Sequence, residues 1–132
     1  MTTITRFEDI RAWQAARQLV SDVYRLVDGT PLGRDFGLRD QLTRAAVSIM
    51  SNIAEGFGRN SAKDFARFLD LSRASAAEVQ SLLYVASDVG YLEETHAAAM
   101  RRNTDECIAM IAGFQRYLRS PNSESRAADR NL

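Results

Sequence analysis

The sequence predicts an all-α protein, an antiparallel up-and-down four-helix bundle. Four segments of the 132-residue chain place apolar residues three and four positions apart, which is the period of an amphipathic helix. Short breaks that contain glycine separate these segments, and no segment has the apolar and polar alternation of a strand. Because short connections favour antiparallel neighbours, we expect one helical domain over residues 1–119. Residues 120–132 contain few apolar side chains, and we expect them to form a mobile tail.

The first helix is expected over about residues 7–27. Its apolar positions, among them Trp13 and Val23, recur at helical spacing, and acidic residues lie in its first turn, where the helix dipole favours them. Gly29 and Pro31 follow, and they predict a turn because glycine is flexible and proline donates no backbone hydrogen bond.

The second helix, about residues 35–55, separates into two faces more sharply than any other segment. Its apolar arc spans roughly 180 to 200°, whereas one core contact needs a stripe of roughly 100°. The arc comprises Leu42, Ala45, Ala46, Ile49, Met50, Ile53, Ala54 and Phe57, with Val47 at its margin. A helix this apolar is expected to have more neighbours than one small bundle supplies. Gly56 is expected to be its left-handed C-terminal residue.

The third helix is expected over about residues 61–89. Ser61 and Asp64 form a capping-box pattern at its start, and Gly90 is expected to end it. The apolar positions that follow the cap predict one stripe that faces the core.

The fourth helix, about residues 93–119, has spacings of four and three that resemble the a/d rhythm of knobs-into-holes packing. This seam comprises His96, Met100, Asn103, Cys107, Met110, Phe114 and Tyr117. Asn103 would be its polar member, fixing the register of the packed helices.

Composition excludes several classes of function. The 17 lysines and arginines balance the 17 aspartates and glutamates, so net charge predicts no attraction to nucleic acid or membrane, and such binding would need a local patch. A single cysteine excludes an intrachain disulfide, and no leader or spanning helix is recognisable. We therefore expect a cytoplasmic protein that does not bind membranes.

Catalytic and metal-binding patterns are poorly supported. His96 and Cys107 share a helical face but stand roughly 16 Å apart along its axis, too far to act as a base and nucleophile pair. Gly56 and Gly58 lack the third glycine and the lysine of a phosphate loop. We expect no enzyme, no cofactor and no metal.

The main candidate site is a polar stripe on the second helix, opposite its apolar arc. It comprises Gln41, Arg44, Ser48, Ser51, Asn52, Glu55 and Arg59. Asp40 with Arg44, and Glu55 with Arg59 if the helix reaches that far, stand in the favourable order for pairs at i, i+4. The small central residues would let another backbone approach closely. Three interpretations stay open: a solvated face, a polar network in a subunit interface, or a ligand groove.

The polar stripe lies within a longer motif. Residues 41–59, in the pattern QLxRAAxSIxSNIAEGFGR, resemble the signature of the bacterial four helix bundle proteins, also described as 23S rRNA intervening sequence proteins. The resemblance covers about residues 7–118. Met50 stands where the family usually has proline, which should remove a kink, and Ala74 stands where it usually has glycine.

This resemblance implies a homopentamer of four-helix protomers. It also implies a role with nucleic acid, because some relatives are encoded inside rRNA intervening sequences. Others are accessory proteins of diversity-generating retroelements that bind nucleic acid and a reverse transcriptase. The implied partners are therefore the chain itself, RNA or DNA, and a reverse transcriptase. Those accessory proteins are strongly basic, whereas this chain is neutral.

Two functional hypotheses follow. In the first, a non-enzymatic oligomer is a scaffold for an RNA or nucleoprotein partner. The side chains expected to contact its phosphates are Arg44, Arg59, Arg67 and Arg73. In the second, the protein is a protein-binding module that uses the groove around Ser48, Asn52 and Glu55, without nucleic acid.

Overall fold

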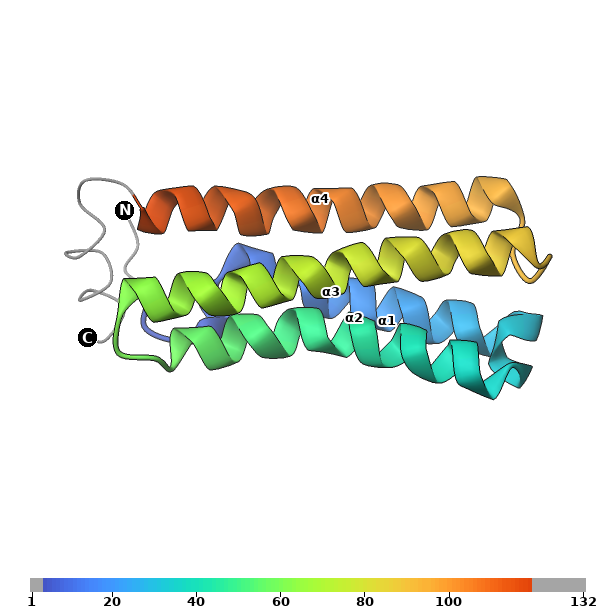
Figure 1. Ribbon diagram of the computed structural model, residues 1–132, viewed down its shortest axis with the longest axis horizontal. Coiled ribbons are helices and arrows are strands. Elements are labelled where there is room, and N and C mark those ends of the chain that lie inside the picture. Colours follow the sequence, from blue (N-terminus) through green and yellow to red (C-terminus); the bar gives the residue numbers. More distant parts are fainter. Residues whose placement is uncertain (1–3, 120–132) are drawn as a thin grey trace.

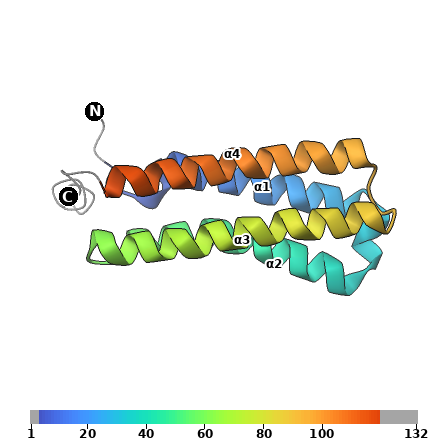
Figure 2. The same cartoon turned by 45° about the horizontal axis from the view of Figure 1, so that its top comes forward.

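The computed structural model describes residues 4–119, which form four long helices joined by short connections (Figure 1). The long helices are α1 (Arg11–Asp28), α2 (Phe36–Phe57), α3 (Ala62–Asp88) and α4 (Glu94–Leu118), and the short 3-10 helices are η1 (Phe7–Asp9) and η2 (Pro31–Arg34). Consecutive long helices run in opposite directions, and Figure 2 shows α1 beside α4 and α2 beside α3. The described residues contain no strand, and the predicted fold class is confirmed. The predicted tail lies outside the described residues.

The chain enters the bundle through η1, and α1 begins at Arg11 rather than near residue 7 as predicted. Between η1 and α1, Ile10 has an extended backbone, with φ −76° and ψ 120°, and its side chain is fully buried. This break lets Phe7 fold back onto Trp13, with the ring centroids 5.1 Å apart in an edge-to-face pair. Core packing therefore outweighs local helix propensity at this position.

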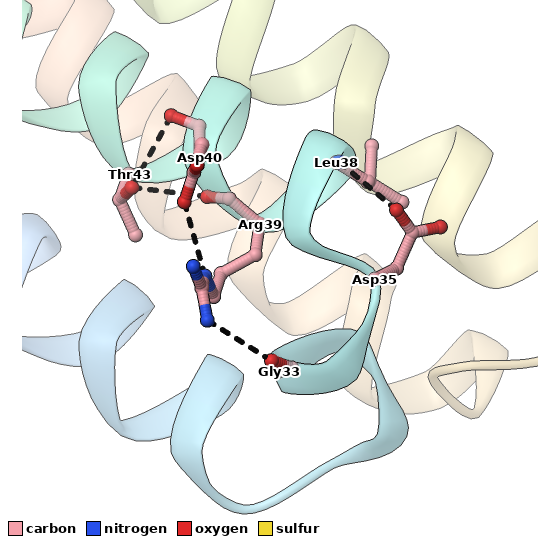
Figure 3. Close-up of polar contacts among 6 residues, drawn as sticks. All are labelled: Gly33, Asp35, Leu38, Arg39, Asp40 and Thr43. Carbon is pink, nitrogen blue, oxygen red and sulfur yellow. Dashed lines mark hydrogen bonds and ion pairs between the residues drawn. The ribbon is translucent and has the colours of Figure 1, made fainter.

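Polar contacts fix the connection between α1 and α2 (Figure 3). Asp35 caps α2 because its Oδ1 accepts a first-turn backbone N–H at 3.1 Å. Its Oδ2 accepts from the Tyr91 hydroxyl at 3.0 Å, and this hydrogen bond raises the pKa of Tyr91 above its ordinary value. The Arg39 guanidinium donates to the Gly33 carbonyl oxygen at 3.3 Å and to Asp40 at 3.0 Å. Arg39 thus holds η2 against the start of α2.

The end of α2 differs from its prediction. The helix reaches Phe57, and Gly56 lies inside it. The prediction of a left-handed Gly56 is wrong, since Gly90 is the one glycine with positive φ among the described residues. Gly56 instead permits a close approach, because a Cβ built there would lie 2.7 Å from Phe65 and 2.8 Å from Phe68. Glycine therefore lets the start of α3 lie directly against the end of α2.

The apolar arc of α2 is covered mostly within the protomer, by α1 and α3. Its buried members are Leu42, Ala45, Ala46, Ile49 and Ile53, and its partly buried members are Met50, Ala54 and Phe57. Only the marginal Val47 is exposed, at 37%. The arc therefore leaves little apolar surface for a further subunit, contrary to the expectation from its width. The helix also continues through Met50 without interruption.

Both terminal signals of α3 are confirmed. The Ser61 Oγ accepts from the backbone N–H of Asp64 at 3.0 Å, as in a capping box. At the other end Gly90 has φ 84°, and the Tyr91 N–H donates back to the Ala86 carbonyl oxygen at 2.9 Å. Glycine thus stops the helix by taking up the left-handed conformation.

α4 packs through a different stripe from the predicted seam. Its buried residues are Ala97, Met100, Thr104, Cys107, Ile111, Gln115 and Leu118. His96 and Asn103 are exposed, and Met110 is 44% exposed, so the prediction of a buried Asn103 is wrong. Thr104 can lie in the core because its hydroxyl donates to the Met100 carbonyl oxygen at 2.8 Å, which satisfies the buried polar group.

Candidate interaction surfaces

A small polar network joins α2 to α3 at the centre of the polar stripe. The hydroxyl groups of Ser48 and Ser75 share a hydrogen bond of 2.8 Å. Asn52 Nδ2 donates to the Ser48 carbonyl oxygen at 2.9 Å and to the Ser48 Oγ at 3.0 Å. On the core side, the Ser72 hydroxyl donates to the Ile49 carbonyl oxygen at 2.7 Å. The bond between Ser48 and Ser75 and the bond from Ser72 to Ile49 span the two helices and fix their register.

The other stripe residues on α2 lie outside this network. Gln41, Arg44, Ser51 and Glu55 are exposed. Among the described residues, Asp40 pairs with its neighbour Arg39 at 3.0 Å and not with Arg44, so that predicted pair is wrong. The predicted pair of Glu55 and Arg59 required both residues to be helical, but α2 ends before Arg59.

Five stripe residues line one shallow hollow on the surface of α1 and α2, which we call the α2 hollow. Its volume is about 560 Å³, and its lining comprises Tyr24, Thr43, Arg44, Val47, Ser48, Ser51, Asn52 and Glu55. Gln41 and Arg59 do not line it. The lining combines exposed apolar groups with one positive and one negative side chain, a mixture that suits contact with another protein.

The four arginines predicted to contact nucleic acid do not form one patch. Arg44 lies in the α2 hollow, and Arg73 bonds to α4. Arg59 and Arg67 converge at the turn between α2 and α3, where their guanidinium carbons lie 4.5 and 4.8 Å from the centre of the Phe68 ring. The cation–π contacts hold these two arginines at one surface.

A buried polar residue, Gln115, joins α3 to α4 and was not among the predicted site residues. It is 1% exposed, and its Nε2 donates to Asp70 at 2.6 Å and to a backbone carbonyl of α3 at 3.3 Å. Its Oε1 accepts from Arg73 at 3.0 Å. The side-chain amide is thus fully used in fixing α3 against α4. A glutamine four residues after Ile111 and three before Leu118 is the sequence signal for it.

A second stripe on α3 and its C-terminal cap was also missed, and we call it the outer stripe. It comprises Leu71, Ser75, Glu78, Leu82, Val85 and Val89, spaced alternately by four and three residues. Leu71, Val85 and Val89 are 45, 42 and 56% exposed. The apolar positions of α3 predicted only a core-facing stripe, although the outer stripe has the same helical spacing.

A further hollow, of about 970 Å³, lies at the connection between α1 and α2. Its charged lining residues are Arg25, Asp28, Arg34, Arg39 and Asp40. Because carboxylates accompany the arginines and Arg39 already bridges η2 and α2, this region forms a structural junction.

The two candidate catalytic residues, His96 and Cys107, differ in their exposure to solvent. His96 is exposed, whereas Cys107 is 1% exposed, and burial raises the pKa of its thiol to about 11. The thiol therefore stays protonated near neutral pH, and a protonated thiol is a poor nucleophile. Within residues 4–119 no group of three or more His, Cys, Asp or Glu side chains could hold a metal ion. None of the described helices has the length and apolar content that a membrane span requires.

Fold and surface together define a class, a helical-bundle protein whose candidate sites lie on helix surfaces and at the turn between α2 and α3. The chain belongs to the 23S rRNA-intervening sequence protein family, whose model matches residues 8–113. The resemblance seen in the motif at residues 41–59 is thereby confirmed.

A solved structure from Bacteroides thetaiotaomicron is similar in fold. It is described as a protein of unknown function from the S23 ribosomal protein family. The TM-score is 0.73 at 17% sequence identity, over 79% of this chain and 97% of that chain, and at this identity the likeness shows the fold alone. A search of curated proteins gave no match. Neither description names a catalytic activity.

Proposed function

We propose that the protein is a non-enzymatic scaffold that associates with copies of itself and holds an RNA or nucleoprotein partner. The outer stripe of α3 carries this proposal. Its alternating spacing is the pattern that packs knobs-into-holes against another helix, and three of its apolar members are at least 42% exposed in the protomer. Exposed apolar groups aligned on one helix face favour a helical partner.

A second copy of the chain suits this face because the face carries both signs of charge. On α2, Arg44 lies four residues before Ser48, which is about one helical turn from the hydrogen bond between Ser48 and Ser75. On α3, Glu78 lies three residues after Ser75 and is also about one turn from that bond. Because the two signs of charge are mixed on this face, two copies that bury the apolar groups against each other do not bring together surfaces of one sign. The pentamer is the assembly that the family resemblance implies.

Light scattering on the full chain tests the self-association. We expect five times the protomer mass of 14.7 kDa for the wild type. Leu71→Glu with Val85→Glu should lower the mass toward that of one protomer, because association would bury both new charges. Met110→Glu is the matched control, since Met110 is equally exposed but lies on α4. A monomeric wild type, or a control that dissociates as readily, would contradict the proposal.

The RNA part of the proposal is supported by family membership and by the two arginines held on the Phe68 ring. Arginine binds phosphate through two parallel hydrogen bonds, so fixed guanidinium groups suit a nucleic-acid backbone. Binding of RNA to the wild type should therefore weaken steeply as salt rises. Absence of binding at low salt, or binding that ignores salt, would refute this part.

The α2 hollow favours a second candidate function, a protein-binding module without nucleic acid. Its apolar Tyr24 and Val47 lie beside the opposite charges of Arg44 and Glu55, and the chain has no net charge to attract a polyanion. An intact oligomer that binds no RNA at low salt would support this alternative.

A further inference from the structure

The neutral chain carries a charge separation along the bundle axis. Residues 4–19, 47–75 and 106–119 make up the half that contains the α2–α3 turn (Figure 1), and they hold nine lysines and arginines against six aspartates and glutamates. Residues 20–46 and 76–105 make up the opposite half, with six against nine. The first half, which we call the positive end, thus has a formal charge of +3 and the other half has −3.

A hollow of about 540 Å³ opens at the positive end, beside the turn between α2 and α3. Three of its lining residues are the cations Arg59, Lys63 and Arg67. The Phe68 ring beneath Arg59 and Arg67 is only 6% exposed, so it forms a fixed platform for both guanidinium groups. Ordered cations lose less conformational entropy on binding than free ones do.

Two carboxylates line the same hollow, and both are engaged within the protein. Asp64 accepts from the Arg67 guanidinium at 3.0 and 3.1 Å, and Asp70 accepts from the buried Gln115 at 2.6 Å. The three cations therefore outnumber the two carboxylates in the lining of this hollow.

The last turn of α4 adds charge at the same end of the bundle as this hollow (Figure 1). The Phe114 ring lies 5.4 Å from the Phe65 ring, which places the end of α4 against the start of α3. Arg116 and Arg119 are both exposed at that end of α4. The cations of the positive end thus come from segments that are distant in the sequence.

We propose that the positive end is the surface that binds the phosphate backbone of an RNA strand, with Arg59, Lys63 and Arg67 as its central contacts. This inference rests on the RNA part of the proposed function and assigns it a place on the bundle. The charge separation orients the approach, because the negative half is repelled by the same polyanion that the positive end attracts. A neutral chain can bind RNA in this way.

Fluorescence anisotropy with a labelled single-stranded oligouridylate tests the assignment on the full chain. The three central phosphate contacts alone contribute a slope of about −2 for log K against log salt, or about 20-fold weaker binding at about 200 mM than at about 50 mM salt. The variant Arg59→Gln, Lys63→Gln, Arg67→Gln should bind about 10-fold or more weakly at the lower salt, and its slope should be shallower than that of the wild type by about 2.

The matched control is Arg25→Gln, Arg34→Gln, Arg102→Gln, which removes the same three charges from the negative half. It should bind within about twofold of the wild type, because the removed charges lie far from the RNA. A second variant, Arg116→Gln with Arg119→Gln, leaves the Phe68 platform untouched and should lose about fivefold or more. Thermal melts by circular dichroism identify any variant that fails to fold.

Each outcome separates this inference from the function on which it rests. Equal weakening by the control, or undiminished binding by both positive-end variants, would overturn the positive end as the site while RNA binding itself stands. Failure of the wild type to bind at low salt would refute the RNA part of the proposed function. Competition by polyglutamate as strong as that by RNA would identify an acidic protein as the partner and overturn the inference.

Discussion

Replacement of Gly56 by alanine has an effect that the structure defines sharply. The new Cβ would lie 2.7 Å from Phe65 Cδ1 and 2.8 Å from Phe68 Cβ, whereas ordinary contacts begin at 3.4 Å. Because the Phe68 Cβ is joined directly to the α3 backbone, relief requires α2 and α3 to separate. Such overpacking costs about 3 kcal/mol, at the upper end of its usual range, and the better helix propensity of alanine returns about 1 kcal/mol.

We therefore expect Gly56→Ala to lower the free energy of unfolding by about 2 kcal/mol, and the melting temperature by about 6 to 10 °C. Urea unfolding followed by circular dichroism measures the change. Wild type and variants are compared at one protein concentration, because association would make stability depend on it.

The matched control is Gly113→Ala, the same substitution inside α4. There the new Cβ would lie 3.6 Å from the movable end of the Arg116 side chain, so nothing opposes it. Gly113→Ala should raise the free energy of unfolding by about 0.5 to 1 kcal/mol. If Gly56→Ala unfolds at the same urea concentration as Gly113→Ala, the close approach of α2 and α3 at Gly56 is not what the glycine provides.

Two further predictions concern buried polar groups. Gln115→Leu should lower the free energy of unfolding by about 1 to 3 kcal/mol, because it removes the hydrogen bonds to Asp70 and Arg73. An unchanged urea midpoint would show that these bonds add no net stability. Burial raises the pKa of Cys107 from 9.0 to about 11 in the folded state. The protonated thiol is therefore more compatible with the buried site than the thiolate is, and protonation favours the folded state. This contribution is complete below about pH 9 and is lost as the pH rises to about 11, a loss of about 2 to 3 kcal/mol. Urea unfolding of Cys107→Ala across that range should lack this loss, and parallel pH profiles for wild type and variant would refute it.

Helix ends were predictable where the signal is local. Ser61 and Gly90 act on backbone groups within a few residues, so the pattern around each of them was sufficient. The start of α1 was not predictable in the same way. Ile10 leaves the helix because it is buried in the core, and Phe7 leaves it to pack on Trp13.

The candidate site was predictable in part. The pairing of Ser48 with Asn52 follows from their spacing on one helix, whereas their partner Ser75 belongs to α3. The predicted arginines separate because Arg73 turns toward Gln115, a contact across 42 positions of the chain. Spacing along one helix carries no information about such a partner.

The sequence by itself determined the four-helix architecture and the family, because helical periodicity, caps and the motif at residues 41–59 are contained in short segments. Only the tertiary structure decided which side of α4 is buried. Adjacent residues differ by 100° around a helix, so a buried stripe displaced by one position includes Thr104 and leaves Asn103 exposed. The tertiary structure also decided what Gly56 does and where the positive end lies. Both depend on segments that meet only when the helices align, and charges far apart in the sequence add their fields only after folding has placed them together.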